Sequence, residues 1–383
     1  MNNGVVRIFV LIDALGWRFL EQREFLSDLL PCQMPLRTVL GFSSGAIPTI
    51  LTGLPPQQHG HWNLFYYDPQ HSPFRWLRHF SFLSNQVLDH RITRRLIKEM
   101  GRRFLGLGPL FECCVSPRLL PWFNWVEKRN IYHRGGILGT PSIFDQLAEH
   151  EISHRVYSYH HNSDDEILRC AKRDVASGEV EFLFLYLSEM DLFLHHNCHD
   201  RTRWGQRLDR YAGGLRELFQ LAQSTYSSPT FTIFSDHGMT AVRNHYDLIA
   251  DLELLGLKTP DDYLAVYDST MARFWFFNER ARHELTQCLQ SAPCGRILSE
   301  QELETFGVFF PDHRYGELIF LMHPGWLLSR SDFNGRGWMP VGMHGYDPGD
   351  PDSDGVFLSN HQPAFPMRTI ADVYHCMREA VPQ

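Results

Sequence analysis

The sequence predicts an α/β fold in which a mostly parallel central sheet is covered by helices on both faces. Three apolar runs, at residues 5–12, 181–187 and 230–234, have the length and the residue types of fully buried strands. Each run leads into a segment in which we expect a turn and a helix. Strands that alternate with helices in this way are typical of a parallel sheet enclosed between two helical layers.

Length and composition exclude several classes of protein. The chain has 383 residues, of which 43% are hydrophobic and 21% charged, so it can form two or three domain-sized units and is neither disordered nor fibrous. Its formal charge of −8 argues against a protein that coats nucleic acid or covers a membrane surface. No 18 apolar residues run together, so no membrane span is expected.

The cysteines and the first residues predict the compartment. Eight cysteines are scattered along the chain without a Cys-x-x-Cys pair, which is neither a disulfide framework nor a zinc-finger pattern. The first residues run directly into an apolar strand and lack the cleavage site of a signal peptide. We therefore expect a cytoplasmic protein.

Two stretches interrupt the alternation of strands and helices. Residues 61–136 are rich in aromatic side chains and arginine, and we interpret them as a cap-like insertion. A helix is expected there near 89–103, with its basic side chains in solvent. The pattern from 246 to 336 predicts a small inserted α+β domain. The core then consists of residues 1–245 and 337–383.

Acidic residues follow each predicted strand. Asp13, Asp191 and Asp236 come after the first, second and third strand. Ligand sites of parallel sheets lie at the carboxyl ends of the strands, so these side chains are expected at one edge. His195 follows Asp191 by one helical turn, His237 follows Asp236, and His344 lies in a run that we expect at a further edge of the same sheet. The neighbouring His196 and His199 remain alternatives to His195.

Aspartate and histidine together are typical ligands of zinc and similar divalent ions. Three of each suit two ions better than one. In two-metal sites one ion activates the attacking oxygen and the other stabilises the leaving oxygen. The residues therefore predict phosphoryl or sulfuryl transfer.

The order of these motifs resembles the alkaline phosphatase superfamily, and most closely its type I phosphodiesterase/nucleotide pyrophosphatase branch. The resemblance rests on Asp13, the Thr52-Gly53 turn, Asp191-x-x-x-His195, Asp236-His237-Gly238 and His344-Gly345-Tyr346. It implies an alkaline-phosphatase-like three-layer sandwich. In that family the nucleophile stands nine residues before the threonine of the Thr-Gly turn, which indicates Ser43 here, with Ser44 as the alternative.

The resemblance also implies roles for the site residues. One metal ion would be held by Asp13, Ser43, Asp236 and His237, and the other by Asp191, His195 and His344. The expected ions are zinc, with manganese as the alternative. Ser43 would attack phosphorus and form a covalent phosphoseryl intermediate. Backbone N–H groups after Ser43, with Gly45 allowing close approach, would hold the developing charge.

The expected substrate is a small phosphodiester or nucleotide-type molecule, not a nucleic-acid polymer. The run Ser43-Ser44-Gly45-Ala46-Ile47 lacks the proline and arginine that sulfatases need, which argues against a sulfatase. Two alternatives stay open. One is a phosphomonoesterase or phosphotransferase with the same two-metal site, which a Lys/Arg pair on the phosphate would favour. The other is a catalytically silent binding protein of the same fold. The substrate-binding residues and the oligomeric state are not predicted.

Overall fold

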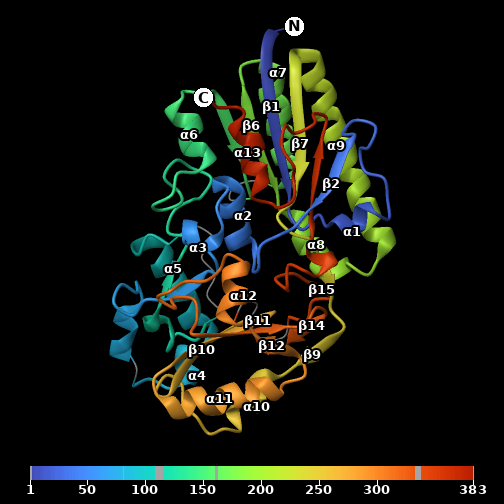
Figure 1. The fold of residues 1–383 in the computed structure, drawn as a ribbon. Coiled ribbons are helices and arrows are strands. Elements are labelled where there is room, and N and C mark those ends of the chain that lie inside the picture. Colours follow the sequence, from blue (N-terminus) through green and yellow to red (C-terminus); the bar gives the residue numbers. More distant parts are fainter. Residues whose placement is uncertain (1, 81, 108–114, 160–162, 333–337, 383) are drawn as a thin grey trace.

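The computed structural model describes residues 2–80, 82–107, 115–159, 163–332 and 338–382 (Figure 1). A six-stranded sheet of order β2–β16–β7–β1–β6–β5 forms its centre. Strands β7, β1, β6 and β5 are parallel, and β16 is antiparallel to both of its neighbours. This confirms the predicted α/β fold with a mostly parallel sheet. The strands are β1 (Asn2–Ile12), β2 (Cys32–Leu36), β5 (His154–Tyr157), β6 (Phe182–Leu187), β7 (Tyr226–Phe234) and β16 (Gly355–Ser359).

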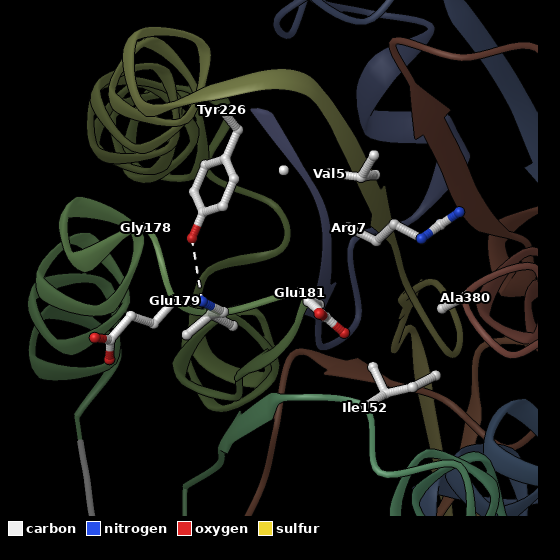
Figure 2. Close-up of a pocket in the computed structure, with 10 residues that line it drawn as sticks. Val5, Arg7, Ile152, Gly178, Glu179, Glu181, Tyr226 and Ala380 are labelled. Atoms are coloured by element: carbon white, nitrogen blue, oxygen red, sulfur yellow. Dashed lines mark hydrogen bonds between the residues drawn. The ribbon is translucent and has the colours of Figure 1, made fainter. Parts of the chain in front are cut away.

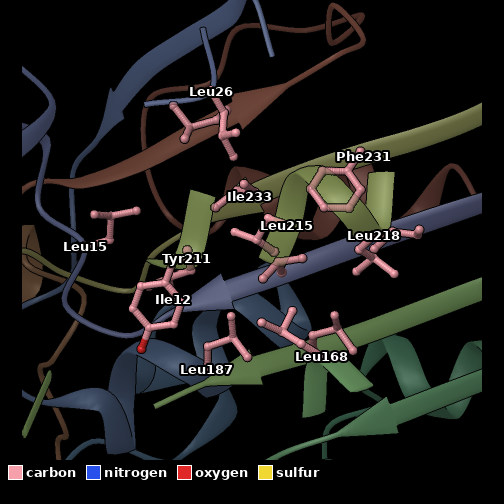
Figure 3. Packing of buried hydrophobic residues seen from close by; sticks show 14 of the residues in the cluster. Ile12, Leu15, Leu26, Leu168, Leu187, Tyr211, Leu215, Leu218, Phe231 and Ile233 are labelled. Atoms are coloured by element: carbon pink, nitrogen blue, oxygen red, sulfur yellow. The ribbon is translucent and has the colours of Figure 1, made fainter. Parts of the chain in front are cut away.

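Helices cover both faces of this sheet, and β1 shows why. Its alternate residues Val6, Ile8 and Val10 are buried on one face, against α7 (Asp164–Ser177) and α9 (Arg201–Thr225). Phe9 and Leu11 are buried on the other face, in a cluster that draws on α2 (Ser43–Thr52), α6 (Ile143–Glu149) and α13 (Asp372–Arg378). Figure 3 shows the first layer, with leucines of α7 and α9 packed on the strands. Each such buried side chain contributes about 1.5–3 kcal/mol.

The third strand departs from the expected pattern, because no helix follows β7. The chain instead passes through Asp236 and His237 into the short strand β8 (Thr240–Ala241). Gly238 explains the difference: its N–H donates to the carbonyl of Ser353 at 2.9 Å, and a Cβ atom there would lie 2.2 Å from the carbonyl oxygen of Asp352. This segment is fixed against the turn that precedes β16.

A second sheet lies within residues 246–336. Its strand order is β10–β11–β13–β12, and all its neighbouring strands are antiparallel. Helices α10 and α11 pack on it, and Figure 1 shows it beyond the carboxyl edge of the main sheet. The elements are β10 (Tyr263–Asp268), β11 (Met271–Phe276), β12 (Gly295–Ile297), β13 (Leu318–Met322), α10 (Leu248–Glu253), α11 (Glu279–Ser291), α12 (Glu300–Thr305) and the pair β9 (Asn244–Tyr246) with β14 (Trp326–Leu328).

The segment 61–136 packs against this second sheet. Phe65 and Trp125 of this segment form one buried cluster with Leu264 and Val266 of β10. The helix expected near 89–103 is observed as α5 (Arg91–Phe104). Among the described residues, every helix is too short or too polar to cross a bilayer. Further elements are β3 (Phe65–Tyr67), β4 (Phe123–Trp125), α1 (Trp17–Leu20), α3 (Pro56–His59), α4 (Asn85–Leu88) and the 3-10 helices Arg75–Phe80, Leu120–Trp122 and Pro351–Ser353.

Candidate metal centre

The three predicted aspartates gather at one edge of the main sheet. Asp13 directly follows β1, and Asp236 follows β7 by two residues. Asp191 lies in the first turn of α8 (Glu189–Asn197), the helix after β6. Because β1 pairs with both β6 and β7, the three strand ends are neighbours. Oxygen atoms of Asp13 and Asp191 and a ring nitrogen of His237 all lie within 4.8 Å of one another.

A first group of donor atoms surrounds His237. Its Nε2 lies 3.1 Å from Ser43 Oγ, 3.5 Å from Asp13 Oδ1 and 3.3 Å from Asp236 Oδ2. Two atoms that bind one tetrahedral ion at about 2.0–2.1 Å are themselves roughly 3.3–3.4 Å apart. The observed separations therefore fit a shared divalent ion.

A second group is centred on Asp191. Its Oδ2 lies 3.2 Å from His195 Nε2, and its Oδ1 lies 3.5 Å from His344 Nε2. The donor atoms of these three residues lie within 4.8 Å of one another, so they could hold a second ion. The four-residue spacing of Asp191 and His195 puts both on one face of α8. The rings of His195 and His196 both lie against Trp338, with centroids 5.0 Å and 6.1 Å from it, but of the two only His195 contacts Asp191 among the described residues.

His344 reaches this group by an unexpected route. We expected it at a further strand end of the main sheet, but it follows β15 (Gly342–Met343), which pairs with β8 in a separate two-stranded ribbon. Close packing on α8 explains this position, since a Cβ atom at Gly342 would lie 2.9 Å from the carbonyl oxygen of Leu194. The carbonyl of Gly342 in turn accepts a hydrogen bond from His195 Nδ1 at 2.8 Å, which directs Nε2 toward Asp191.

Buried atoms without partners support metal binding. Asp13 Oδ1, Asp191 Oδ1 and Asp236 Oδ2 are buried and have no hydrogen-bond partner among the described residues. The other oxygen of Asp13 accepts a hydrogen bond from the hydroxyl of Tyr186, so only Oδ1 is left. An unsatisfied buried carboxylate is costly, and a bound cation removes that cost. The donor set therefore fits divalent metal.

The charges of the centre point the same way. Burial, together with the nearby Asp236 and Asp191, raises the pKa of Asp13 well above its usual value. Burial also acts to raise the pKa of Asp191, but His195 and His344 hold it below the usual value. Burial and the adjacent His237 lower the pKa of His344, which keeps its imidazole neutral. A neutral imidazole is the form that binds a metal ion.

Ser43 and Ser44 have different surroundings. Ser43 is the first residue of α2 and faces His237. The hydroxyl of Ser44 donates to the carbonyl of Trp62 at 2.8 Å. Gly45 corrects an expectation: it does not open space for a substrate but packs on Trp62, where a Cβ atom would lie 3.1 Å from the carbonyl oxygen. Its N–H and that of Ala46 are bound to the carbonyl of Phe42.

A cavity of about 350 Å³ opens on this centre. Ser43, Asp191, His195 and His344 lie in its wall. The rest of the described lining is mainly apolar and aromatic, with three further carboxylates and no lysine or arginine. These residues are Phe42, Ser44, Leu64, Phe65, Val115, Trp125, Glu127, Tyr159, Val266, Asp268 and Asp332. Residues 160–162, which follow Tyr159, lie outside the described residues.

Three features of the site had not been predicted. Tyr186, which binds Asp13, is one residue of an apolar strand and carries no signal of its own. Asn63 is buried, its Oδ1 has no partner among the described residues, and its neighbour Leu64 lines the cavity. An asparagine inside the aromatic run after His59-Gly60 is the signal that could have found it. Glu127 and Asp332 are far from every motif in the sequence.

A second cavity, of about 540 Å³, lies at the opposite end of the main sheet (Figure 2). Val5, Arg7 and Glu181 at the amino ends of β1 and β6 line it, and the Tyr226 hydroxyl accepts a hydrogen bond from the N–H of Val180 there. Ligand sites of such sheets lie at the carboxyl ends. Although it is larger, this cavity contains none of the predicted site residues.

The α/β fold and the clustered metal-binding residues are those of a hydrolase of phosphoric esters that depends on divalent metal. The chain belongs to the type I phosphodiesterase/nucleotide pyrophosphatase family, whose profile matches residues 8–347. It is accordingly a phosphodiester or pyrophosphate hydrolase.

Solved structures show the same fold at low sequence identity. Human ectonucleotide pyrophosphatase/phosphodiesterase 5 is 16% identical, with a TM-score of 0.69 over 98% of this chain and 94% of that chain. An inactive murine counterpart in complex with AMP is 16% identical, with a TM-score of 0.66 over 98% and 94%. Phosphonoacetate hydrolase from Sinorhizobium meliloti 1021, in complex with phosphonoformate, is 12% identical, with a TM-score of 0.65 over 99% and 96%. No curated protein matches the sequence.

Proposed function

We propose that the protein hydrolyses a small phosphodiester or pyrophosphate with two divalent ions and Ser43 as nucleophile. The observation that carries the proposal is the position of His237 Nε2, which lies 3.1–3.5 Å from oxygen atoms of Ser43, Asp13 and Asp236. A serine hydroxyl within ligand distance of a metal site is the arrangement that nucleophilic catalysis requires.

Two ligand sets follow from the two groups of atoms. Asp13, Ser43, Asp236 and His237 would hold one ion, and Asp191, His195 and His344 the other. The mixture of imidazole and carboxylate favours zinc, with manganese as the alternative. When bound, the ions supply Lewis acidity for the attacking and leaving oxygens.

The protein side of the reaction has two steps. Ser43 Oγ attacks phosphorus, the bond from phosphorus to the alcohol or phosphate leaving group breaks, and the hydroxyl proton is transferred to that group, which leaves a phosphoseryl ester. Water then attacks this phosphorus, so that the monoester product leaves and the serine hydroxyl is restored. We assign the N–H of Ser44 and the amide of Asn63 to the nonbridging oxygen, because Gly45 and Ala46 already donate to Phe42.

The cavity favours a substrate with a single negative charge. Its described lining contains Glu127, Asp268 and Asp332 and neither lysine nor arginine. Asp268 forms an ion pair with the buried Arg273 at 2.6 Å, and burial raises the pKa of both Glu127 and Asp332 to about 7. The second negative charge of a monoester would find no lysine or arginine in the described lining and would meet these carboxyls as they ionise above about pH 7, whereas a diester carries one charge fewer. This supports the diesterase over the monoesterase alternative.

The aromatic part of the lining suits a planar or apolar leaving group. Phe65 and Trp125 form its wall, and their rings are 5.1 Å apart in an edge-to-face arrangement. A nucleotide-type diester is compatible with such a wall, and AMP is the ligand in the structure of the murine relative. We also propose a cytoplasmic location, supported by the free thiols of the six described cysteines.

Trapping of the intermediate tests the nucleophile. The zinc-loaded protein is mixed with p-nitrophenyl thymidine 5′-phosphate, quenched with acid during turnover and digested for mass spectrometry. We expect a thymidylyl group on Ser43 and none in a Ser43→Ala variant. A modified Ser44, or rapid turnover without any trapped peptide, would contradict the assignment.

A further inference from the structure

Helix α5 carries an open apolar row in addition to its buried face. Ile92, Leu96, Met100 and Phe104 recur every four residues and are 57%, 59%, 40% and 72% exposed. Residues at this spacing lie on one side of a helix. The buried Ile97 already anchors the helix in the cluster that contains Phe65 and Trp125. The row is therefore a second apolar face, which the described part of the chain leaves exposed.

The segment before the helix adds to this surface. Phe80, Phe82 and Val87 are 41%, 80% and 49% exposed. Seven of the thirteen exposed large hydrophobic side chains of the described chain thus fall between residues 80 and 104. Concentrated exposed apolar surface marks an interaction site. We call these seven residues the α5 patch.

The charge of α5 selects the partner. The helix has five arginines and one lysine against one glutamate, a local formal charge of +5, whereas the whole chain carries −8. Arg91, Arg95, Arg102 and Arg103 are exposed, as predicted from their spacing. The negative charge of the whole chain argued against a membrane-surface protein, but it does not apply to α5, whose own charge is positive.

We propose that α5 docks the protein on an anionic lipid surface. A basic amphipathic helix binds such a surface by inserting its apolar face between headgroups while its cations meet the lipid phosphates. A second copy of the chain is a poorer occupant, because two helices of charge +5 would repel each other. A polyanion such as nucleic acid would leave the apolar row in water.

The helix shares its core with the wall of the cavity. Ile97 of α5 belongs to the same buried cluster as Phe65, Val115 and Trp125, which line the cavity over the metal centre. Docking through the outer face of α5 would therefore bring the cavity close to the lipid headgroups. The inference itself uses no feature of the centre, so it stands or falls separately from the proposed chemistry.

Vesicle flotation tests the proposal with the intact protein. Vesicles of phosphatidylcholine alone are compared with vesicles that also contain phosphatidylglycerol. We expect flotation with the anionic vesicles, weakened by added salt. The double change Leu96→Gln and Phe104→Gln should weaken it about tenfold or more, because two inserted side chains are lost. Leu254→Gln is the matched control, since Leu254 is 86% exposed but lies outside the α5 patch.

The outcomes separate docking from a folding defect and from self-association. Both variants should keep wild-type hydrolysis of a small water-soluble diester. Wild-type protein that fails to float with anionic vesicles, or floats equally with neutral ones, would overturn the proposal. It would also be overturned by a dimer in sedimentation that the double change dissociates, because a second copy would then cover the patch. If the wild-type protein does not hydrolyse the diester at all, the proposed function is contradicted but the proposed lipid docking is not.

Discussion

His237 Nε2 lies 3.1 Å from Ser43 Oγ and so joins the end of β7 to the first residue of α2. The same nitrogen lies 3.5 Å from Asp13 Oδ1 and 3.3 Å from Asp236 Oδ2. An ion bound by these three residues would therefore be within reach of the serine hydroxyl. The candidate nucleophile thus belongs to the candidate metal site. The predictions below test the residues of this site and of its surroundings.

Adjacent serines should respond differently to the loss of their hydroxyl groups. Ser43→Ala should abolish turnover but keep at least one ion, because the Asp191 group is untouched. Ser44→Ala should keep most of the activity and lose about 1 kcal/mol of stability with its hydrogen bond to Trp62. Turnover, metal analysis and urea unfolding measure these effects. Near-wild-type turnover in Ser43→Ala would remove it as the nucleophile.

A carboxylate of the centre should control the metal content. Asp236→Ala should abolish turnover and lower the bound metal, since Oδ2 of this residue has no partner among the described residues. The change is checked by elemental analysis of dialysed protein. Asp209→Ala is a matched control, because Asp209 forms only an exposed ion pair with Arg23. Full metal content in Asp236→Ala would argue against its role as a ligand.

Glu127 should make the stability depend on pH. Burial raises its pKa from 4.5 to about 7, so the folded state keeps its proton in a range where the unfolded chain has lost it. Its contribution to stability is therefore fully present below about pH 4.5 and is lost as the pH rises to about 7.

The variant Glu127→Gln has no carboxyl group at this position and should not lose stability over this pH range. Relative to the wild type it should be more stable by about 1–3 kcal/mol above pH 7 and equal below pH 4.5. Urea unfolding across this range measures the difference, with the exposed Glu304→Gln as control. A constant difference at all pH values would show that the carboxyl does not titrate as expected.

Two glycines should respond in opposite ways to alanine. At Gly238 a Cβ atom would lie 2.2 Å from a backbone oxygen, so Gly238→Ala should cost about 2 kcal/mol or more and disturb the neighbouring His237. Gly213 lies inside α9 with nothing within 4 Å of the added carbon, so Gly213→Ala should stabilise the protein by about 1 kcal/mol. Thermal unfolding and turnover distinguish the two. An unchanged Gly238→Ala would mean that this segment can move.

The sequence predicted those parts of the fold and site that local patterns determine. Apolar runs indicated β1, β6 and β7, and the acids that follow them pointed to the shared edge. The four-residue spacing selected His195 over His196, and in the structure the Nε2 atom of His195 lies 3.2 Å from Asp191 Oδ2. The boundaries proposed for the domains, 61–136 and 246–336, remain proposals.

The remaining parts depend on contacts between distant segments. The ribbon that presents His344 forms only because β15 meets β8, about a hundred residues earlier in the chain. From the sequence, Gly45 was expected to leave space for the substrate, but in the structure Trp62 packs on it. Tyr186 has no local signal, since it is one residue of a buried strand. Such partners cannot be inferred from spacing alone.

The ratio of two turnover rates tests the central claim most directly. Zinc- or manganese-loaded protein is supplied with bis-p-nitrophenyl phosphate or with p-nitrophenyl phosphate, and Ser43→Ala serves as the blank. The absence of lysine and arginine from the described lining of the cavity predicts that the diester is hydrolysed faster than the monoester. A ratio well below one would contradict the diesterase account and favour a monoesterase, and no activity above the blank would favour a silent binding protein.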